Sequence, residues 1–196
     1  MGREIVRSRK TRETNVHCRL RIDGEGRASV KTGIGFWDHM LETIAKHALW
    51  DLELTADGDL VVDDHHTVED TGIVLGQAIR EALGERTRIA RFGSAYAPLD
   101  EALSRAVIDL VDRPGASVSF LFTRERIGAW STETGAHFFE TLAVQAGFTL
   151  HLDTLKGEND HHRIESACKA FALAFRAATA VDSRVEVAST KARMRS

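Results

Sequence analysis

Hydrophobic residues recur at helical spacing in two long stretches of the chain, residues 65–83 and 164–175. Intervals of three and four residues place apolar side chains on one face of a helix, and such a face is usually buried. The apolar residues of the earlier stretch are Val68, Leu75, Ile79 and Leu83, and those of the later stretch are Ile164, Ala167, Cys168, Phe171, Ala172 and Phe175. We therefore predict two helices that each pack one face against a core.

An aspartate stands at the expected start of each of these helices, Asp64 in the first and Asp160 in the second. The carboxylate of an N-cap aspartate accepts a hydrogen bond from a free N–H group of the first turn. Gly84 follows the first helix, and glycine is favoured just after the last helical residue. We expect the aspartates to cap the helix starts and Gly84 to end the first helix.

Short apolar runs bounded by turn residues predict strands between the helices. These runs cover residues 16–22, 28–30, 49–54, 102–111, 118–122 and 148–152. Strands and helices that alternate in this way indicate an α+β fold in which helices cover sheets.

The chain is internally duplicated. Residues 39–45 and 137–143 share a histidine, two apolar residues, Glu, Thr, an aliphatic residue and Ala, which indicates a copied helix. The offset is 137 − 39 = 98 residues at this histidine and 161 − 65 = 96 residues at a later histidine pair, so the register is nearly constant. We predict two similar halves, residues 1–90 and 91–187, in one compact unit, followed by a tail at 188–196.

Composition narrows the class of protein. The chain has 196 residues, of which 43% are hydrophobic, so it is long enough to bury a core. Two cysteines are too few for a disulfide scaffold, and no apolar segment precedes the charged start, so we expect a cytoplasmic protein. No apolar run nears the roughly 18 residues of a membrane span. A net charge of −3, with acidic and basic residues interspersed, gives no basic face for nucleic acid.

The histidines carry the candidate chemistry. The motif His-His-x-x-Glu occurs twice, at residues 65–69 and 161–165. On a helix, residues i and i+4 share a face, whereas residue i+1 points about 100° away. One motif therefore serves two metal ions. We assign the ligands of one ion to His39, His66, His161 and Glu165, and those of the other to His137, His162, His65 and Glu69.

Three imidazoles and one carboxylate suit manganese, iron, cobalt or zinc. A six-coordinate ion with these ligands keeps two positions open, as a catalytic site requires. The alternative for a single His-His pair is a capping or core-satisfying role, but duplication of the pair with the same Glu spacing argues against it. From the ligands alone, another di-metal enzyme, such as a hydrolase or an oxygenase, and a non-catalytic metal-binding protein stay open.

Over nearly its whole length the chain resembles the imidazoleglycerol-phosphate dehydratase family. The matching motifs, in order, are residues 12–14, 33–41, 64–70, 91–93, 98–102, 145–151 and 160–165. The resemblance implies a duplicated fold of the ribosomal protein S5 domain 2-like type, two Mn²⁺ ions per active site, and a homo-oligomer of 24 subunits with sites completed at subunit contacts.

The resemblance also implies a reaction. Members of the family are hydro-lyases of histidine biosynthesis, which convert D-erythro-imidazole-glycerol phosphate to imidazole acetol phosphate. The small S5-like fold alone would also suit small-molecule kinases or RNA-associated domains, but the Gly-x-Gly at residues 33–35 lacks the remaining residues of a phosphate-binding loop.

Further site residues follow from the resemblance. Glu13 matches the family's candidate acid/base and contacts substrate. Residues matching the phosphate-binding groups are Arg91, Arg113, Ser189, Thr190 and Lys191, although Ala188 and Ala192 replace the usual Pro and Gly beside them. Lys169 and His47 match positions near the substrate. Without the resemblance, each of the charged residues reads as a solvated surface group.

Overall fold

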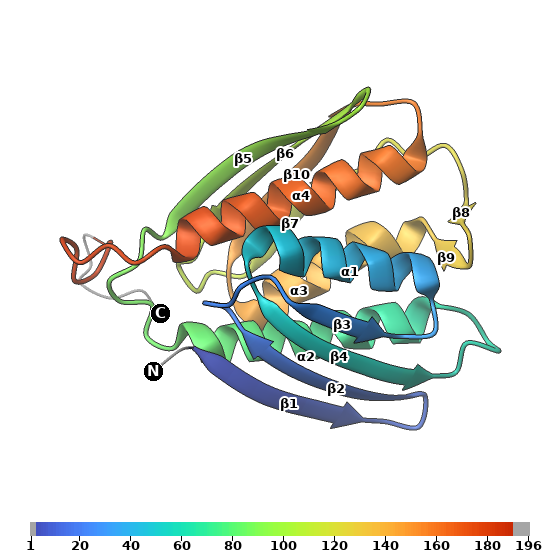
Figure 1. Ribbon diagram of the computed structural model, residues 1–196, viewed down its shortest axis with the longest axis horizontal. Helices are drawn as coiled ribbons and strands as arrows, with labels where there is room; N and C mark the ends of the chain where they lie inside the picture. Colours follow the sequence, from blue (N-terminus) through green and yellow to red (C-terminus); the bar gives the residue numbers. More distant parts are fainter. Residues whose placement is uncertain (1–2, 190–196) are drawn as a thin grey trace.

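Two four-stranded sheets enclose a layer of helices in the computed structural model, which describes residues 3–189 (Figure 1). The first half contains β1 (Glu4–Lys10), β2 (Thr14–Arg21), β3 (Ala28–Lys31), α1 (Gly35–Ala48), β4 (Asp51–Gly58) and α2 (His65–Leu83). The second half contains β5 (Phe92–Leu99), β6 (Ala102–Asp109), β7 (Gly115–Ser119), β8 (Arg126–Ile127), β9 (Trp130–Ser131), α3 (Glu133–Ala146), β10 (Thr149–Lys156) and α4 (Asp160–Thr179).

The two sheets have the same topology. Their strand orders are β1-β2-β4-β3 and β5-β6-β10-β7. In each sheet the third strand of the half pairs in parallel with the strand between the helices, and the other pairs are antiparallel. The α+β class and the internal duplication are therefore confirmed.

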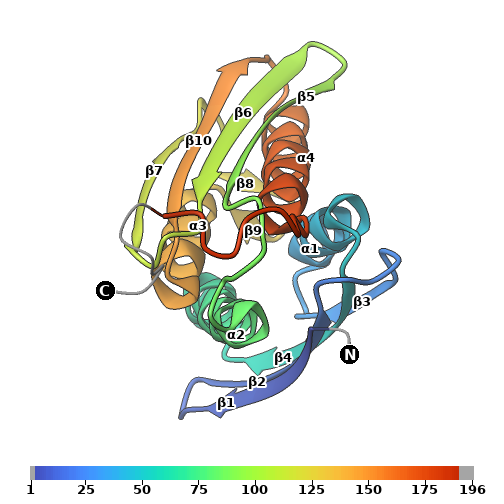
Figure 2. The ribbon, with the colours of Figure 1, turned by 90° about the vertical axis from the view of Figure 1, so that its left-hand side faces the viewer.

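The helices of the two halves pack against one another as well as on their own sheets. Viewed end-on, α1 lies beside α4 and α2 lies beside α3, with one sheet on each side of this layer (Figure 2). The predicted apolar faces of α2 and α4 are buried, because each helix contacts both a sheet and a helix of the other half. None of the helices within residues 3–189 combines the length and apolar character that a membrane crossing requires.

The prediction that Asp64 and Asp160 cap the starts of α2 and α4 is wrong. Asp64 precedes α2 but makes no capping bond, since its carboxylate accepts hydrogen bonds from the backbone and hydroxyl of Ser131. Asp160 is already inside α4, and the N-cap is Asn159, whose side chain accepts the His161 N–H. Gly84 does end α2, with a φ of 51° that favours glycine.

Two strands that the hydrophobic pattern did not indicate, β1 and β5, form edges of the sheets. The strand β1 is mostly exposed and carries several charges, and β5 contains Gly93 and Pro98. Edge strands tolerate such residues because one side lacks a hydrogen-bonded neighbour. The six strands predicted from apolar runs lie within a few residues of their predicted bounds, whereas the short pair β8 and β9 was not predicted.

Candidate metal centre

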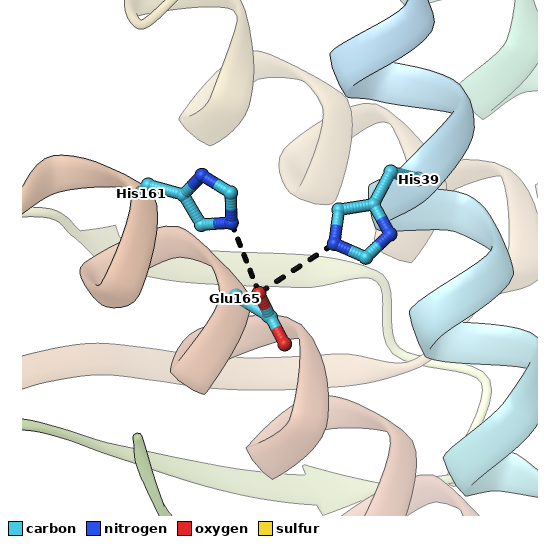
Figure 3. A group of neighbouring side chains, drawn as sticks. All are labelled: His39, His161 and Glu165. Atoms are coloured by element: carbon cyan, nitrogen blue, oxygen red, sulfur yellow. Dashed lines mark hydrogen bonds and ion pairs between the residues drawn. The ribbon is translucent and has the colours of Figure 1, made fainter. Parts of the chain in front are cut away.

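A histidine of α1 meets a histidine and a glutamate of α4 (Figure 3). The Glu165 Oε2 atom lies 3.1 Å from His161 Nε2 and 3.6 Å from His39 Nε2. His161 and Glu165 are one helical turn apart and share a face, and the packing of α1 on α4 brings His39 to that face. We call these three residues the first cluster.

A lysine borders the first cluster. Lys169, a further turn along α4, places Nζ 2.8 Å from Glu165 Oε1. Burial acts to raise the pKa of Glu165, but the hydrogen bond and positive charge of Lys169, together with His161 and His39, outweigh burial, and the pKa is lowered. Desolvation and the charge of Lys169 lower the pKa of the half-buried His47 on α1. His47 and Lys169 therefore both lie near the first cluster, and their contact with substrate stays a prediction.

The other pair of helices repeats the arrangement. His65 and Glu69 on α2 share a face with His137 of α3, and His137 Nε2 lies 3.0 Å from Glu69 Oε1. The His65 and His137 rings stack with their centroids 4.9 Å apart. We call these three residues the second cluster. Each cluster thus takes one histidine from one half of the chain and a His-x-x-x-Glu pair from the other.

The second histidine of each motif points away from both clusters. His66 Nδ1 lies 3.1 Å from a carboxylate oxygen of Asp59, and His162 Nδ1 lies 2.8 Å from Glu101 Oε2. These hydrogen bonds raise the pKa of both histidines. Hydrogen bonds, the first from the Asn159 N–H, lower the pKa of Glu101 to about 2. Asp59 and Glu101 were not expected from the sequence, although Glu101 lies within the matching motif at residues 98–102.

The structure therefore brings together three residues of each predicted ligand set and separates the fourth, His66 or His162, from it. In each cluster the possible ligand atoms all lie within 4.8 Å of one another. Two donors bound to one ion at about 2.1 Å lie roughly 3 Å apart when adjacent and about 4.2 Å apart when opposite. The imidazole and carboxylate donors therefore fit a transition-metal ion, and the complete sets stay a prediction.

Glu13 lies in the turn between β1 and β2, beside the loop that carries Asp59. Its backbone carbonyl accepts the Asp59 N–H at 3.0 Å. Its side chain is exposed, and its carboxylate forms no hydrogen bond or ion pair with the other residues of 3–189. A carboxylate without a fixed partner is available to exchange a proton with a substrate.

Arg91, one of the expected phosphate-binding residues, lies at the end of α4 far from the first cluster, where its N–H bonds to the Ala178 carbonyl. Arg91 donates to Asp109 at 2.7 and 3.0 Å and to the Ala188 carbonyl, which places Ser189 near it. Arg113 is exposed between β6 and β7. Thr190 and Lys191 lie outside the described residues.

Comparisons with known proteins agree with these features. A sequence profile described as imidazoleglycerol-phosphate dehydratase matches residues 32–175. The imidazoleglycerol-phosphate dehydratase of Acinetobacter baumannii (strain AYE) is 50% identical over 190 residues, which are 96% of this chain and 93% of that protein.

Solved structures with the same name share the fold. The IGPD from Pyrococcus furiosus, in complex with (S)-C348, superposes with a TM-score of 0.82 at 35% identity, over 95% of this chain and 99% of that one. The Staphylococcus aureus imidazoleglycerol-phosphate dehydratase gives a TM-score of 0.77 at 33% identity, over 90% and 99% of the two chains. The chain belongs to the imidazoleglycerol-phosphate dehydratase family.

Proposed function

We propose that the chain is a metal-dependent hydro-lyase of histidine biosynthesis, which removes water from D-erythro-imidazole-glycerol phosphate to give imidazole acetol phosphate. The observation that carries this proposal is the pair of matching clusters, His39 with His161 and Glu165, and His65 with Glu69 and His137. The relatives that share the sequence and fold bear the name of this dehydratase. We place the enzyme in the cytoplasm, with which the free, buried Cys18 and Cys168 agree.

Each active site would use two Mn²⁺ ions, one for each cluster. His66 would complete the first cluster and His162 the second, giving three nitrogen donors and one oxygen donor for each ion. Manganese accepts this mixture of imidazole and carboxylate. Because both histidines face away from the clusters of their own chain, the fourth donor would come from another copy of the chain.

The phosphate-binding residues support the same arrangement. The Arg91 N–H bonds to the Ala178 carbonyl, 13 residues along α4 from Glu165. At 1.5 Å per residue this is about 20 Å, longer than a small phosphorylated imidazole. Asp109 and Ala188 hold the guanidinium at that end of the helix. A substrate bound at the first cluster would therefore reach the phosphate-binding residues of a neighbouring chain.

The outward orientation of His66 and His162 and the distance from the first cluster to Arg91 both support a homo-oligomer, and we propose the 24-subunit assembly that the resemblance implies. In a closed symmetric assembly, every chain gives and receives the same residues. Arg91, Arg113 and Ser189, with Thr190 and Lys191 beyond the described residues, would hold the phosphate of the substrate. Guanidinium and ammonium groups suit a phosphate dianion.

The chemistry requires proton transfer at a carbon that is not acidic. When bound, the ions would supply Lewis acidity to the imidazole ring of the substrate, which would make loss of the hydroxyl beside the ring easier. Glu13 would take the proton from carbon and return one to the product. Lys169 and His47 would contact the substrate beside the first cluster.

Incubation of the Mn²⁺-loaded protein with imidazole-glycerol phosphate tests the activity, and we expect the acetol phosphate to form. Absence of this product would refute the proposal. Metal counting on purified His66→Ala and His162→Ala tests the ligand sets, since each variant should lose one ion of two. Glu13→Gln tests the catalytic role: turnover should be abolished while both ions stay bound. In a protein that only stores metal, this variant should behave as the wild type does.

A further inference from the structure

Glu13 has a structural counterpart in the second half of the chain. Glu13 immediately precedes β2, which begins at Thr14, and Glu101 immediately precedes β6, which begins at Ala102. The offset is the same for the two glutamates, 101 − 13 = 88, and for the two strand starts, 102 − 14 = 88. Each glutamate therefore occupies the same place in the hairpin that joins the first two strands of its half.

Each hairpin turn contacts the loop that precedes the second helix of its half, although through different groups. The Glu13 carbonyl accepts the N–H of Asp59, in the loop that leads to α2. Glu101 Oε1 accepts the N–H groups of Glu158 and Asn159, in the loop that leads to α4, at 3.1 and 2.9 Å. Each turn is thus anchored beside the helix that carries one of the outward-pointing histidines.

The halves differ in the carboxylate that binds the histidine. In the first half, Asp59, the residue directly after β4, bonds to His66 Nδ1, and the Glu13 carboxylate stays unbonded to the rest of 3–189. In the second half, the residue directly after β10 is Gly157, which has no side chain to offer. There Glu101, the counterpart of Glu13, bonds to His162 Nδ1.

We infer that Asp59 and Glu101 are positioning residues for metal binding, and that Asp59 also leaves Glu13 free for proton transfer. A carboxylate that accepts from Nδ1–H fixes the imidazole tautomer and leaves the Nε2 lone pair for an ion. Asp59 would aim His66 at the first cluster of another copy, and Glu101 would aim His162 at the second. This inference rests on the proposed ligand sets.

Amide variants separate this role from packing. In Glu101→Gln the side chain keeps its size and its oxygen stays on the two backbone N–H groups, so its NH₂ group donates to His162 Nδ1, and the ring proton moves to Nε2 and blocks the metal. In Asp59→Asn, either position near His66 Nδ1 can hold the remaining oxygen, but this oxygen is an uncharged and weaker acceptor for Nδ1–H, so the imidazole is a poorer metal ligand. Glu101→Gln retains a carbonyl oxygen for the backbone N–H groups of Glu158 and Asn159, so the loop before α4 keeps its anchor.

Calorimetric titration of Mn²⁺ into the metal-free protein measures the effect. We expect each amide variant to weaken one of the two sites about 10- to 100-fold, the usual effect of losing a carboxylate behind a metal-binding histidine. Asp57→Asn, near the end of β4, and Glu158→Gln, in the loop before α4, change exposed carboxylates and should bind as the wild type does. Asp59→Asn added to His66→Ala should cause no further loss, whereas a general structural defect would add to it.

Two results would overturn the inference in distinguishable ways. If Asp59→Asn and Glu101→Gln bind both ions as tightly as the wild type while His66→Ala and His162→Ala each lose one, the positioning role is wrong and the ligand sets stand. If the two alanine variants also keep both ions, the ligand sets are wrong, and the positioning role falls with them. Thermal unfolding in EDTA establishes that each variant is folded.

Discussion

Replacement of Glu165 by glutamine should destabilise the metal-free protein more than the equivalent change at Glu69. Both glutamates provide the carboxylate of a cluster, so each variant should lose one ion of two. Their surroundings differ, because Glu165 also neutralises Lys169, whose Nζ lies 2.8 Å from it. Glu69 contacts His137 of its cluster at 3.0 Å.

The expected difference follows from burial. The side chains of Glu165 and Lys169 are 15% and 20% exposed, whereas Glu69 is 34% exposed. A hydrogen bond to a charged group contributes about 1.5–3 kcal/mol, and glutamine retains part of it, so we expect Glu165→Gln to cost about 1–2 kcal/mol. A more exposed pair contributes about 0–1 kcal/mol, which we expect for Glu69→Gln.

Thermal unfolding in EDTA near neutral pH measures both variants without metal. A difference of about 1 kcal/mol corresponds to roughly 2–4 °C in a domain of this size, with Glu165→Gln melting lower. Because the pKa of Glu165 in the folded protein lies below the ordinary value of 4.5, its carboxylate is charged at every pH above 4.5. The difference in melting temperature should therefore shrink as the pH falls below this value and Glu165 is protonated. Equal melting temperatures at neutral pH, or a lower one for Glu69→Gln, would refute the role assigned to Lys169.

Three further predictions concern packing, protons and thiols. Gly93→Ala places a Cβ against the Ala174 carbonyl oxygen on α4, well inside van der Waals contact, so urea unfolding should show a loss of about 2–3 kcal/mol in the free energy of unfolding. A change under about 0.5 kcal/mol would contradict the close packing. Metal binding requires neutral imidazole, and the pKa values of His66 and His162 are raised above the ordinary 6.5. The Mn²⁺ affinity should therefore fall as the pH falls towards 6.5 and below, because both rings are then protonated. An affinity unchanged between about pH 8 and pH 5 would exclude histidine ligands. Burial raises the pKa of Cys18 to about 12 and that of Cys168 further, so a thiol reagent should label both only as fast as the protein unfolds.

The helices could be predicted from the sequence because their signal is local. The apolar stripe of α4 follows the helical period from Ile164 to Phe175 and is buried throughout. The strands β1 and β5 gave no comparable signal, since an edge strand is stabilised by one neighbour and need not be apolar. Their existence follows from pairing with β2 and β6, which single-residue preferences do not encode.

The roles of Asp64 and Asp160 depended on contacts distant in sequence. Both aspartates stand where a capping residue is favoured, and both are buried. Ser131 and the Thr123–Arg124 backbone offer them hydrogen bonds from a segment of the second half. A buried carboxylate gains more from several fixed donors than from one frayed helix end, so the tertiary contact replaces the cap.

The candidate site also has one part that local helix geometry predicts and another that depends on distant contacts. Helix geometry alone separates His66 from the face that His65 shares with Glu69, and the structure has this separation. Each chain therefore has two three-donor clusters and two single histidines. These eight donors complete two four-donor sites only when each single histidine meets a cluster of another chain. The ligands are therefore a property of the sequence, whereas the proposed active site is a property of the assembly, and a separated monomer should bind both ions less tightly for want of one donor each.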